Sequence, residues 1–98
     1  MKFINIGKIV NTHGIKGELR ILSHFKYKNK IFSPGFKLYI GKDKYEEIIN
    51  SYRVHKQFDM VTFKGYNDIN EVLKYKGLYV FINSDDFKLH IEAYFDPS

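Results

Sequence analysis

The chain has no cysteine and no tryptophan, and only two prolines among its 98 residues. Without cysteine it has no disulfides and no thiolate metal sites, which is compatible with an intracellular protein. No apolar stretch approaches the roughly 18 residues of a membrane-spanning helix, and the N-terminus has no basic segment followed by an apolar one. These absences predict a soluble, cytoplasmic protein with no membrane partner.

What the chain does contain is enough for one folded domain. Hydrophobic residues make up 44% and aromatic residues 17% of the sequence, which is sufficient apolar material for a core. Lysine and arginine outnumber aspartate and glutamate by 16 to 11, a formal net charge of +5. This surplus favours a polyanionic partner such as RNA, although a solubilising surface explains it equally well.

The most unusual stretch is GKIVNTHGIKGELRIL, from Gly7 to Leu22. It places a histidine inside a glycine-spaced turn and a lysine directly after it. A phosphate-binding P-loop needs a different glycine spacing, and the G-x-x-G clamp of KH domains lies between helices rather than strands. We therefore interpret Gly14 and Gly17 as the turn of a β-hairpin and expect at least one of them to adopt positive φ.

Short runs of β-branched and aromatic residues, separated by turn residues, predict six strands. These strands cover residues 3–11, 17–24, 36–41, 45–56, 58–65 and 78–83. Residues 67–77 change to a helical period, with Asp68 and Glu71 at capping-box spacing and Gly77 as a stop. Because closure removes exposed strand edges, we predict an all-β fold: a small six-stranded antiparallel barrel with one short helix.

Alternation along the strands predicts which side chains fill the barrel. In residues 45–56 the alternation is less regular, and it groups Ile48, Tyr52 and Val54 on one face with Asn50. The expected core residues are Leu19, Ile21, Leu38, Ile40, Val61, Phe63, Leu78, Val80 and Ile82.

The sequence shows no catalytic pattern. The adjacent carboxylates Glu46 and Glu47, like Asp85 and Asp86, diverge to opposite faces of an extended chain and make poor acid–base partners. The four histidines have no metal-ligand spacing. We predict no enzyme, no metal site, no cofactor and no small-molecule substrate.

Three segments in order, IGKIVNTHGIKGELRI, FSPGFKLYIG and NDINEVLKYKGLYVFI, resemble the N-terminal domain of the RimM family of ribosome maturation factors. The family features correspond to Gly7-Lys8-Ile9, His13-Gly14, the stretch from Gly14 to Arg20, the stretch from Phe32 to Tyr39, and the stretch from Asp68 to Val80. The resemblance covers residues 3–85. It implies a barrel similar to the second domain of translation elongation factors.

The resemblance also implies a function and a longer protein. Members of the family bind free small ribosomal subunits, assist maturation of the head, which is the 3′ domain of 16S rRNA, and bind the head's ribosomal protein nineteen. They carry a second, PRC-type barrel after a linker. Residues 86–98 match the start of that linker at Glu92, Tyr94 and Phe95, with Ala93 where the family usually has an aromatic residue. We therefore expect 86–98 to be a poorly packed tail in front of a second barrel that this chain lacks.

For the partner surfaces, the residues suggest cations on the hairpin and on the loop after it. The candidates for contact with RNA or the ribosome are Lys8, His13, Lys16, Arg20, Lys26, Lys28 and Lys30. His13 either stabilises the turn by a hydrogen bond or contacts the partner directly. Tyr94 and Phe95 are candidates for protein contacts, and we expect a monomer.

Two other functions remain open on the residues alone. An OB-like single-stranded nucleic-acid binder would need stacking aromatics and a basic groove, and it would place its helix between the third and fourth strands. A barrel that contacts only protein is the other alternative. The salt dependence of binding separates them, since phosphate contacts weaken steeply as salt rises.

Overall fold

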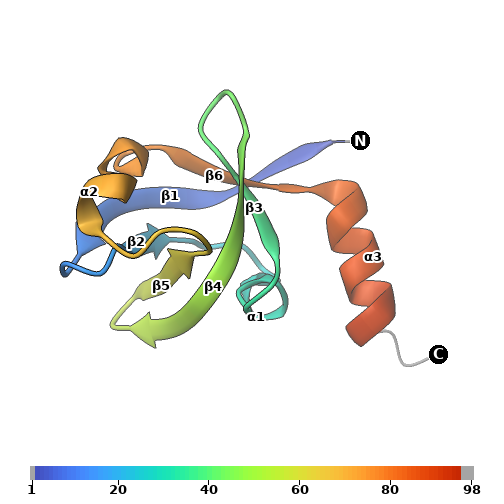
Figure 1. Ribbon diagram of the computed structural model, residues 1–98. Helices are drawn as coiled ribbons and strands as arrows, with labels where there is room; N and C mark the ends of the chain where they lie inside the picture. The colour runs from blue at the N-terminus through green and yellow to red at the C-terminus, as the bar shows by residue number, and fades with distance from the viewer. Residues whose placement is uncertain (1, 96–98) are drawn as a thin grey trace.

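The computed structural model describes residues 2–95 and contains six antiparallel strands (Figure 1). Neighbouring strands close into a ring in the order β1-β2-β5-β4-β3-β6. The predicted all-β antiparallel barrel is confirmed. The strands are β1 (Phe3–His13), β2 (Glu18–Leu22), β3 (Lys37–Ile40), β4 (Tyr45–His55), β5 (Phe58–Phe63) and β6 (Tyr79–Asn83).

The expected helix is present as α2 (Ile69–Val72), followed directly by the 3-10 turn η1 (Leu73–Tyr75). Asp68 caps it, because its Oδ1 accepts a hydrogen bond from the Asn70 N–H at 2.7 Å. Glu71 Oε1 accepts from the N–H of Asn67 at 3.1 Å, one residue earlier than in a regular capping box. A further short helix, α1 (Lys28–Ile31), was not predicted.

The C-terminal segment, expected to be a poorly packed tail, contains a helix that was not predicted. This helix, α3 (Ser84–Tyr94), follows β6 at once and lies beside the barrel, on the side opposite the β1–β2 turn (Figure 1). Asn83 caps it by accepting from the N–H groups of Asp85 and Asp86 at 2.8 and 3.4 Å. Phe87 packs against the edge of the core, but α3 has no fully buried residue. Residues 96–98 of the expected tail lie outside the described residues.

The barrel interior matches the predicted core closely. Eight of the nine expected residues are buried, and Leu78 is partly buried against the same cluster. In β4, however, the buried residues are Glu47 and Ile49, whereas Ile48 and Val54 are exposed. A register shift between Ile49 and Ser51 interrupts the alternation, which explains why a strict two-residue period failed there.

Glu47 shows how the barrel accommodates an inward-facing carboxylate. The hydroxyl of Tyr66 donates to Glu47 Oε2 at 2.8 Å, and the hydroxyl of Tyr75 donates to the same oxygen. Its neighbour Glu46 points outward, 3.8 Å from the Lys37 ammonium, so the two adjacent carboxylates diverge as expected. Both hydroxyls replace hydrogen bonds that water would otherwise supply to Glu47.

Gly7 allows β1 to bend between its two partners. The pairing of β1 with β6 shifts register between Asn5 and Gly7, and a Cβ atom at Gly7 would lie 2.5 Å from the carbonyl oxygen of Leu22. The close approach expected from a glycine inside a strand is therefore present at this position.

We expect Gly7→Ala to lower the free energy of unfolding by about 3 kcal/mol, because a backbone carbonyl cannot move aside as a flexible side chain can. Gly14→Ala is the matched comparison, since Gly14 has φ +73° but open space around it. Its cost should be only about 1 kcal/mol. Urea unfolding followed by circular dichroism measures both, and equal costs would contradict a tight packing of the β1 bend.

Candidate functional site

The glycine-spaced turn of residues 14–17 joins β1 to β2. Gly14 and Gly17 have φ of +73° and +90°, so the expectation of positive φ is confirmed at both. The turn packs on the start of α2: the Ile69 N–H donates to the carbonyl oxygen of Ile15 at 3.0 Å, and a Cβ on Gly17 would lie 3.2 Å from the Asp68 carbonyl oxygen. This contact holds the tip of the hairpin in place.

A second hairpin, β4–β5, turns at the same end of the barrel. Arg53 in β4 makes a bidentate ion pair with Glu18 in β2, with distances of 2.8 Å from Nε to Oε2 and 2.7 Å from Nη2 to Oε1. The rings of His13 and His55 lie 5.8 Å apart. The two hairpins therefore form one continuous surface.

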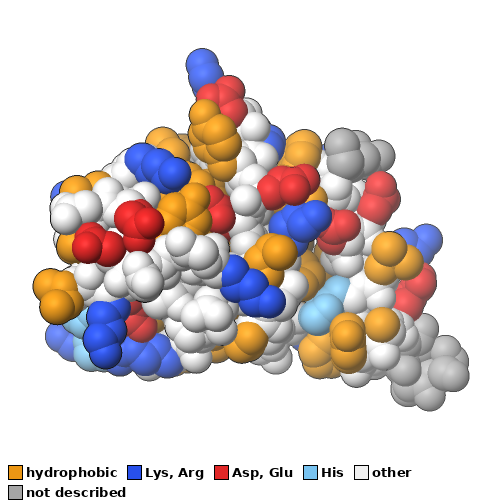
Figure 2. All heavy atoms as spheres, viewed as in Figure 1, with side chains coloured by type: hydrophobic (Ala, Val, Ile, Leu, Met, Phe, Trp, Pro, Cys, Tyr) orange, Lys and Arg blue, Asp and Glu red, His pale blue; other side chains and the backbone are white. Residues whose placement is uncertain are grey.

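We call this surface the hairpin end. In Figure 2, lysine, arginine and histidine side chains gather at the lower left, where Figure 1 shows the tips of the two hairpins. Three members of the hairpin end were expected from the sequence and three were not. The members are His13, Lys16, Arg20, Arg53, His55 and Lys56.

The electrostatics of the hairpin end are dominated by cations. The hydrogen bond from Arg53 lowers the pKa of Glu18 and outweighs burial, which by itself would raise it. The carboxylate is therefore ionised, and it is already paired with Arg53. Desolvation lowers the pKa of His55, and the charges of Arg53 and Lys56 lower it further. Because Arg53 neutralises Glu18, the surrounding cations give this surface a net positive field.

Arg20 and His13 form a pair within this field. Arg20 Nη2 lies 2.8 Å from His13 Nδ1, and because arginine can only donate, Nδ1 is the acceptor. A neutral His13 ring therefore carries its proton on Nε2. The Arg20 guanidinium lies 5.6 Å over the Phe58 ring, and its buried Nε has no partner among the described residues. This geometry favours the hypothesis that His13 stabilises the turn by a hydrogen bond over the alternative of direct contact with the partner.

Lys28 is occupied within the fold, which sets it apart from the other lysines proposed for partner contact. Its ammonium lies 3.1 Å from Oδ2 of the buried Asp59 and 3.2 Å from the Ser23 carbonyl oxygen. The Tyr52 hydroxyl donates to Asp59 Oδ1 at 2.6 Å, and burial together with this bond raises the pKa of Tyr52. Lys28 thus neutralises a buried carboxylate and anchors α1 to β5.

The remaining candidates lie elsewhere on the barrel. Lys8 is exposed on β1, with its ammonium 5.5 Å from the Tyr79 ring centroid. Lys26 and Lys30 lie 5.4 and 5.8 Å from the Tyr27 ring, near the contact between α1 and α3. Among the predicted cations, the structure therefore brings His13, Lys16 and Arg20 together at the hairpin end, and Lys26 and Lys30 together around Tyr27.

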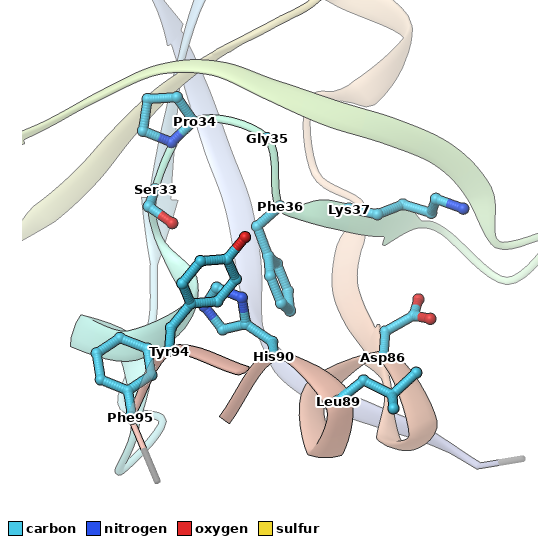
Figure 3. A pocket seen from close by; sticks show the side chains of 10 residues that line it. All are labelled: Ser33, Pro34, Gly35, Phe36, Lys37, Asp86, Leu89, His90, Tyr94 and Phe95. Carbon is cyan, nitrogen blue, oxygen red and sulfur yellow. The ribbon is translucent and has the colours of Figure 1, made fainter. Parts of the chain in front are cut away.

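Tyr94 and Phe95 belong to a groove between α3 and residues 33–37 (Figure 3). The groove has a volume of about 590 Å³, and Phe36 and His90 also line it. His90 Nε2 lies 2.6 Å from the Lys30 carbonyl oxygen and fixes α3 beside α1. Tyr94 is 75% and Phe95 43% exposed, so both side chains remain accessible.

Sequence reasoning missed Arg53, His55 and Lys56. The turn between β4 and β5 has no glycine, and Lys56 itself adopts a φ of +57°. The spacing of Arg53 and His55 indicated that both side chains lie on the same face of β4. Their position beside His13 depends on the pairing of β2 with β5 and of β5 with β4, which the sequence alone did not reveal.

Two negative observations concern residues 2–95. No group of three or more histidine, aspartate or glutamate side chains in this part of the chain could hold a metal ion. None of its helices is long and apolar enough to cross a membrane.

Comparison with known proteins gives the family. The RimM N-terminal domain family matches residues 4–87. The chain belongs to the RimM family. A ribosome maturation factor RimM from an Exiguobacterium species is 44% identical over 87 residues, covering 87% of this chain and 51% of that protein. The RimM of Geobacillus kaustophilus is 44% identical over 80 residues, covering 78% and 46% of the two chains.

Two solved structures share the fold. The solution structure of the N-terminal domain of RimM from Thermus thermophilus has a TM-score of 0.71 at 19% identity and covers 88% of this chain and 94% of its own. A RimM crystal structure from Pseudomonas aeruginosa has a TM-score of 0.66 at 22% identity, covering 86% and 52%. The chain spans about half the length of the curated RimM proteins it matches.

Replacing Lys28 by glutamine should lower the free energy of unfolding by about 1–3 kcal/mol, because the buried Asp59 loses a charged hydrogen-bond donor. Lys26→Gln, an exposed neighbour, should change it by less than about 0.5 kcal/mol. Equilibrium urea unfolding of both variants measures the difference. Equal stability of the two would mean that Lys28 does not support the fold.

His55 should titrate below its ordinary pKa of 6.5 in an NMR pH titration of its ring protons, and Arg53→Gln should raise that pKa by removing a cation. Since the folded-state pKa is lowered, the contribution of His55 to stability is present above pH 6.5 and is lost as pH falls through the folded value. Lys42→Gln, on the distant β3–β4 turn, should leave the titration unchanged. A His55 pKa at or above 6.5 would contradict the described surroundings.

Proposed function

We propose that this chain is the RNA-facing domain of a ribosome maturation factor, and that the hairpin end binds phosphates of 16S rRNA in the head of the free small ribosomal subunit. The observation that carries the proposal is the convergence of two hairpins. They place Arg53 in an ion pair with Glu18, Arg20 beside His13, and Lys16 and Lys56 on the two turns. The names of the relatives support a role in ribosome maturation.

The rigid backbone of the hairpin end favours binding. Lys16 stands on a turn whose backbone is held by α2, so little conformational entropy is lost when its ammonium meets a phosphate. Each exposed ionic contact contributes only about 1 kcal/mol or less, so useful affinity requires several cations acting together. The factor acts by binding immature subunits and leaving them on maturation, in the cytoplasm, as a monomer and without catalysing a reaction.

Protein contacts belong to the other end of the domain in this proposal. Tyr94 and Phe95 are accessible beside the groove of α3, and the Lys30 ammonium lies 5.5 Å from the Phe95 ring. Tyr94 and Phe95 suit a contact with ribosomal protein nineteen of the head, because tyrosine and phenylalanine are enriched at protein interfaces. Lys8 with Tyr79 contributes at most a peripheral cation.

A barrel that binds only protein is the second candidate, and the salt dependence of binding distinguishes it. We expect Lys16→Glu combined with Lys56→Glu to weaken co-sedimentation with small subunits at least about tenfold, because each reversal replaces attraction to phosphate by repulsion. The slope of log affinity against log salt should become shallower by about 1.5, which corresponds to two lost phosphate contacts.

The control is Lys42→Glu combined with Lys2→Glu, which changes the net charge equally but lies on the β3–β4 turn and before β1, at the end of that strand away from the hairpin end. It should leave both the affinity and the slope nearly unchanged. Both double variants must retain the wild-type circular dichroism spectrum. Undiminished binding of the Lys16/Lys56 variant, or a flat salt response of the wild type, would refute the phosphate contact at the hairpin end.

A further inference from the structure

The tip of the β1–β2 hairpin carries an apolar side chain, that of Ile15, which is not part of the hydrophobic core. Ile15 is 80% exposed and lines the same hollow as the cation Lys16. Its backbone is nevertheless fixed, since its carbonyl oxygen accepts the Ile69 N–H at 3.0 Å. Ile15 is therefore presented outward on an ordered backbone.

A hollow lies beside this side chain. It has a volume of about 350 Å³, and Ile15, Lys16, Glu18 and Thr62 line it together with the His13–Gly14 stretch. The lining thus combines an apolar surface, a cation and the Glu18 carboxylate, which accepts hydrogen bonds. The Thr62 hydroxyl is also there, already hydrogen-bonded to Ser51 and accepting from Asn50 at 3.5 Å, and it retains one further hydrogen-bonding position. Glu18 binds Arg53 through both oxygens, but each carboxylate oxygen can accept more than one hydrogen bond.

We infer that this hollow binds one unpaired nucleobase of RNA, with Ile15 against the face of the base and Lys16 at its phosphate. The inference rests on the proposed function and adds to it the class of RNA: a loop or bulge rather than a continuous duplex. A base inside a duplex is stacked and shows only its edge, whereas an unpaired base can turn its face to an apolar side chain. Apolar side chains inserted beside bases are a known means of nucleic-acid recognition.

The polar lining gives the hollow a preference among bases. Acceptors such as a carboxylate and a hydroxyl pair with an exocyclic amino group, which cytosine has and uracil lacks. Because the two pyrimidines are nearly the same size, a comparison of their affinities tests hydrogen bonding independently of shape. The hollow therefore prefers cytosine to uracil.

The experiment compares three RNA ligands of equal length and charge by fluorescence anisotropy with this chain: a hairpin with a cytidine loop, the same hairpin with a uridine loop, and a fully paired duplex. We expect the cytidine loop to bind tightest and the duplex weakest. Ile15→Ser should weaken binding to the cytidine loop about fivefold, the loss expected when part of a buried apolar side chain is removed. It should leave duplex binding and the salt slope unchanged.

Leu89→Ser is the matched control, because Leu89 is 65% exposed on α3 and lies away from the hairpin end. It should not change any of the three affinities. If Ile15→Ser binds the cytidine loop as wild type does, or if wild type binds loop and duplex equally, the base-binding inference is overturned while phosphate binding stands. Equal affinity for the two loops overturns the preference for cytosine. If the Lys16/Lys56 reversal leaves all three RNAs bound as before, the proposed function itself fails.

Discussion

Strand β1 forms hydrogen bonds along both of its edges, to β2 and to β6, and this double pairing closes the barrel. A straight strand could not follow both partners around so small a ring. The register shifts in β1, near Gly7 and again between Ile9 and Asn11, supply the required curvature. The last residue of the strand, His13, thereby reaches the end of the barrel where the second hairpin turns, so the candidate site depends on this bend.

The barrel separates two kinds of surface. The hairpin end is rich in cations and is built from side chains on paired strands, with the β1–β2 turn supported by α2. The groove of α3 is rich in aromatic rings, with His90 between Phe36 and Tyr94. Under the proposed function, RNA and protein bind at opposite ends of the domain and do not compete for one surface.

Local chemistry made much of the fold predictable. Leu19 and Ile21 alternate with Glu18 and Arg20, and Gly14 and Gly17 mark a turn that needs positive φ. Some of the failures depend on partners distant in sequence. Lys28 and Asp59 are 31 residues apart, so the sequence alone did not distinguish this lysine from its free neighbours. The helix α3 was missed because residues 86–98 were interpreted as a linker, although Phe87, Ile91 and Tyr94 have the i, i+4, i+7 spacing of a helix face.

Lys44 and Lys56 adopt positive φ, the region that glycine usually occupies, and they differ in how the fold compensates for it. Lys44 has a φ of +56°, and its ammonium lies 4.2 Å over the Phe81 ring, an attraction that offsets backbone strain. Lys56 has a φ of +57° but is exposed, with the like charge of Arg53 nearby. Lysine at position 56 is locally frustrated, because both the positive φ and the nearby charge of Arg53 disfavour it. Selection of variants for heat resistance alone would favour glycine or asparagine there, and it would discard a cation of the hairpin end in doing so.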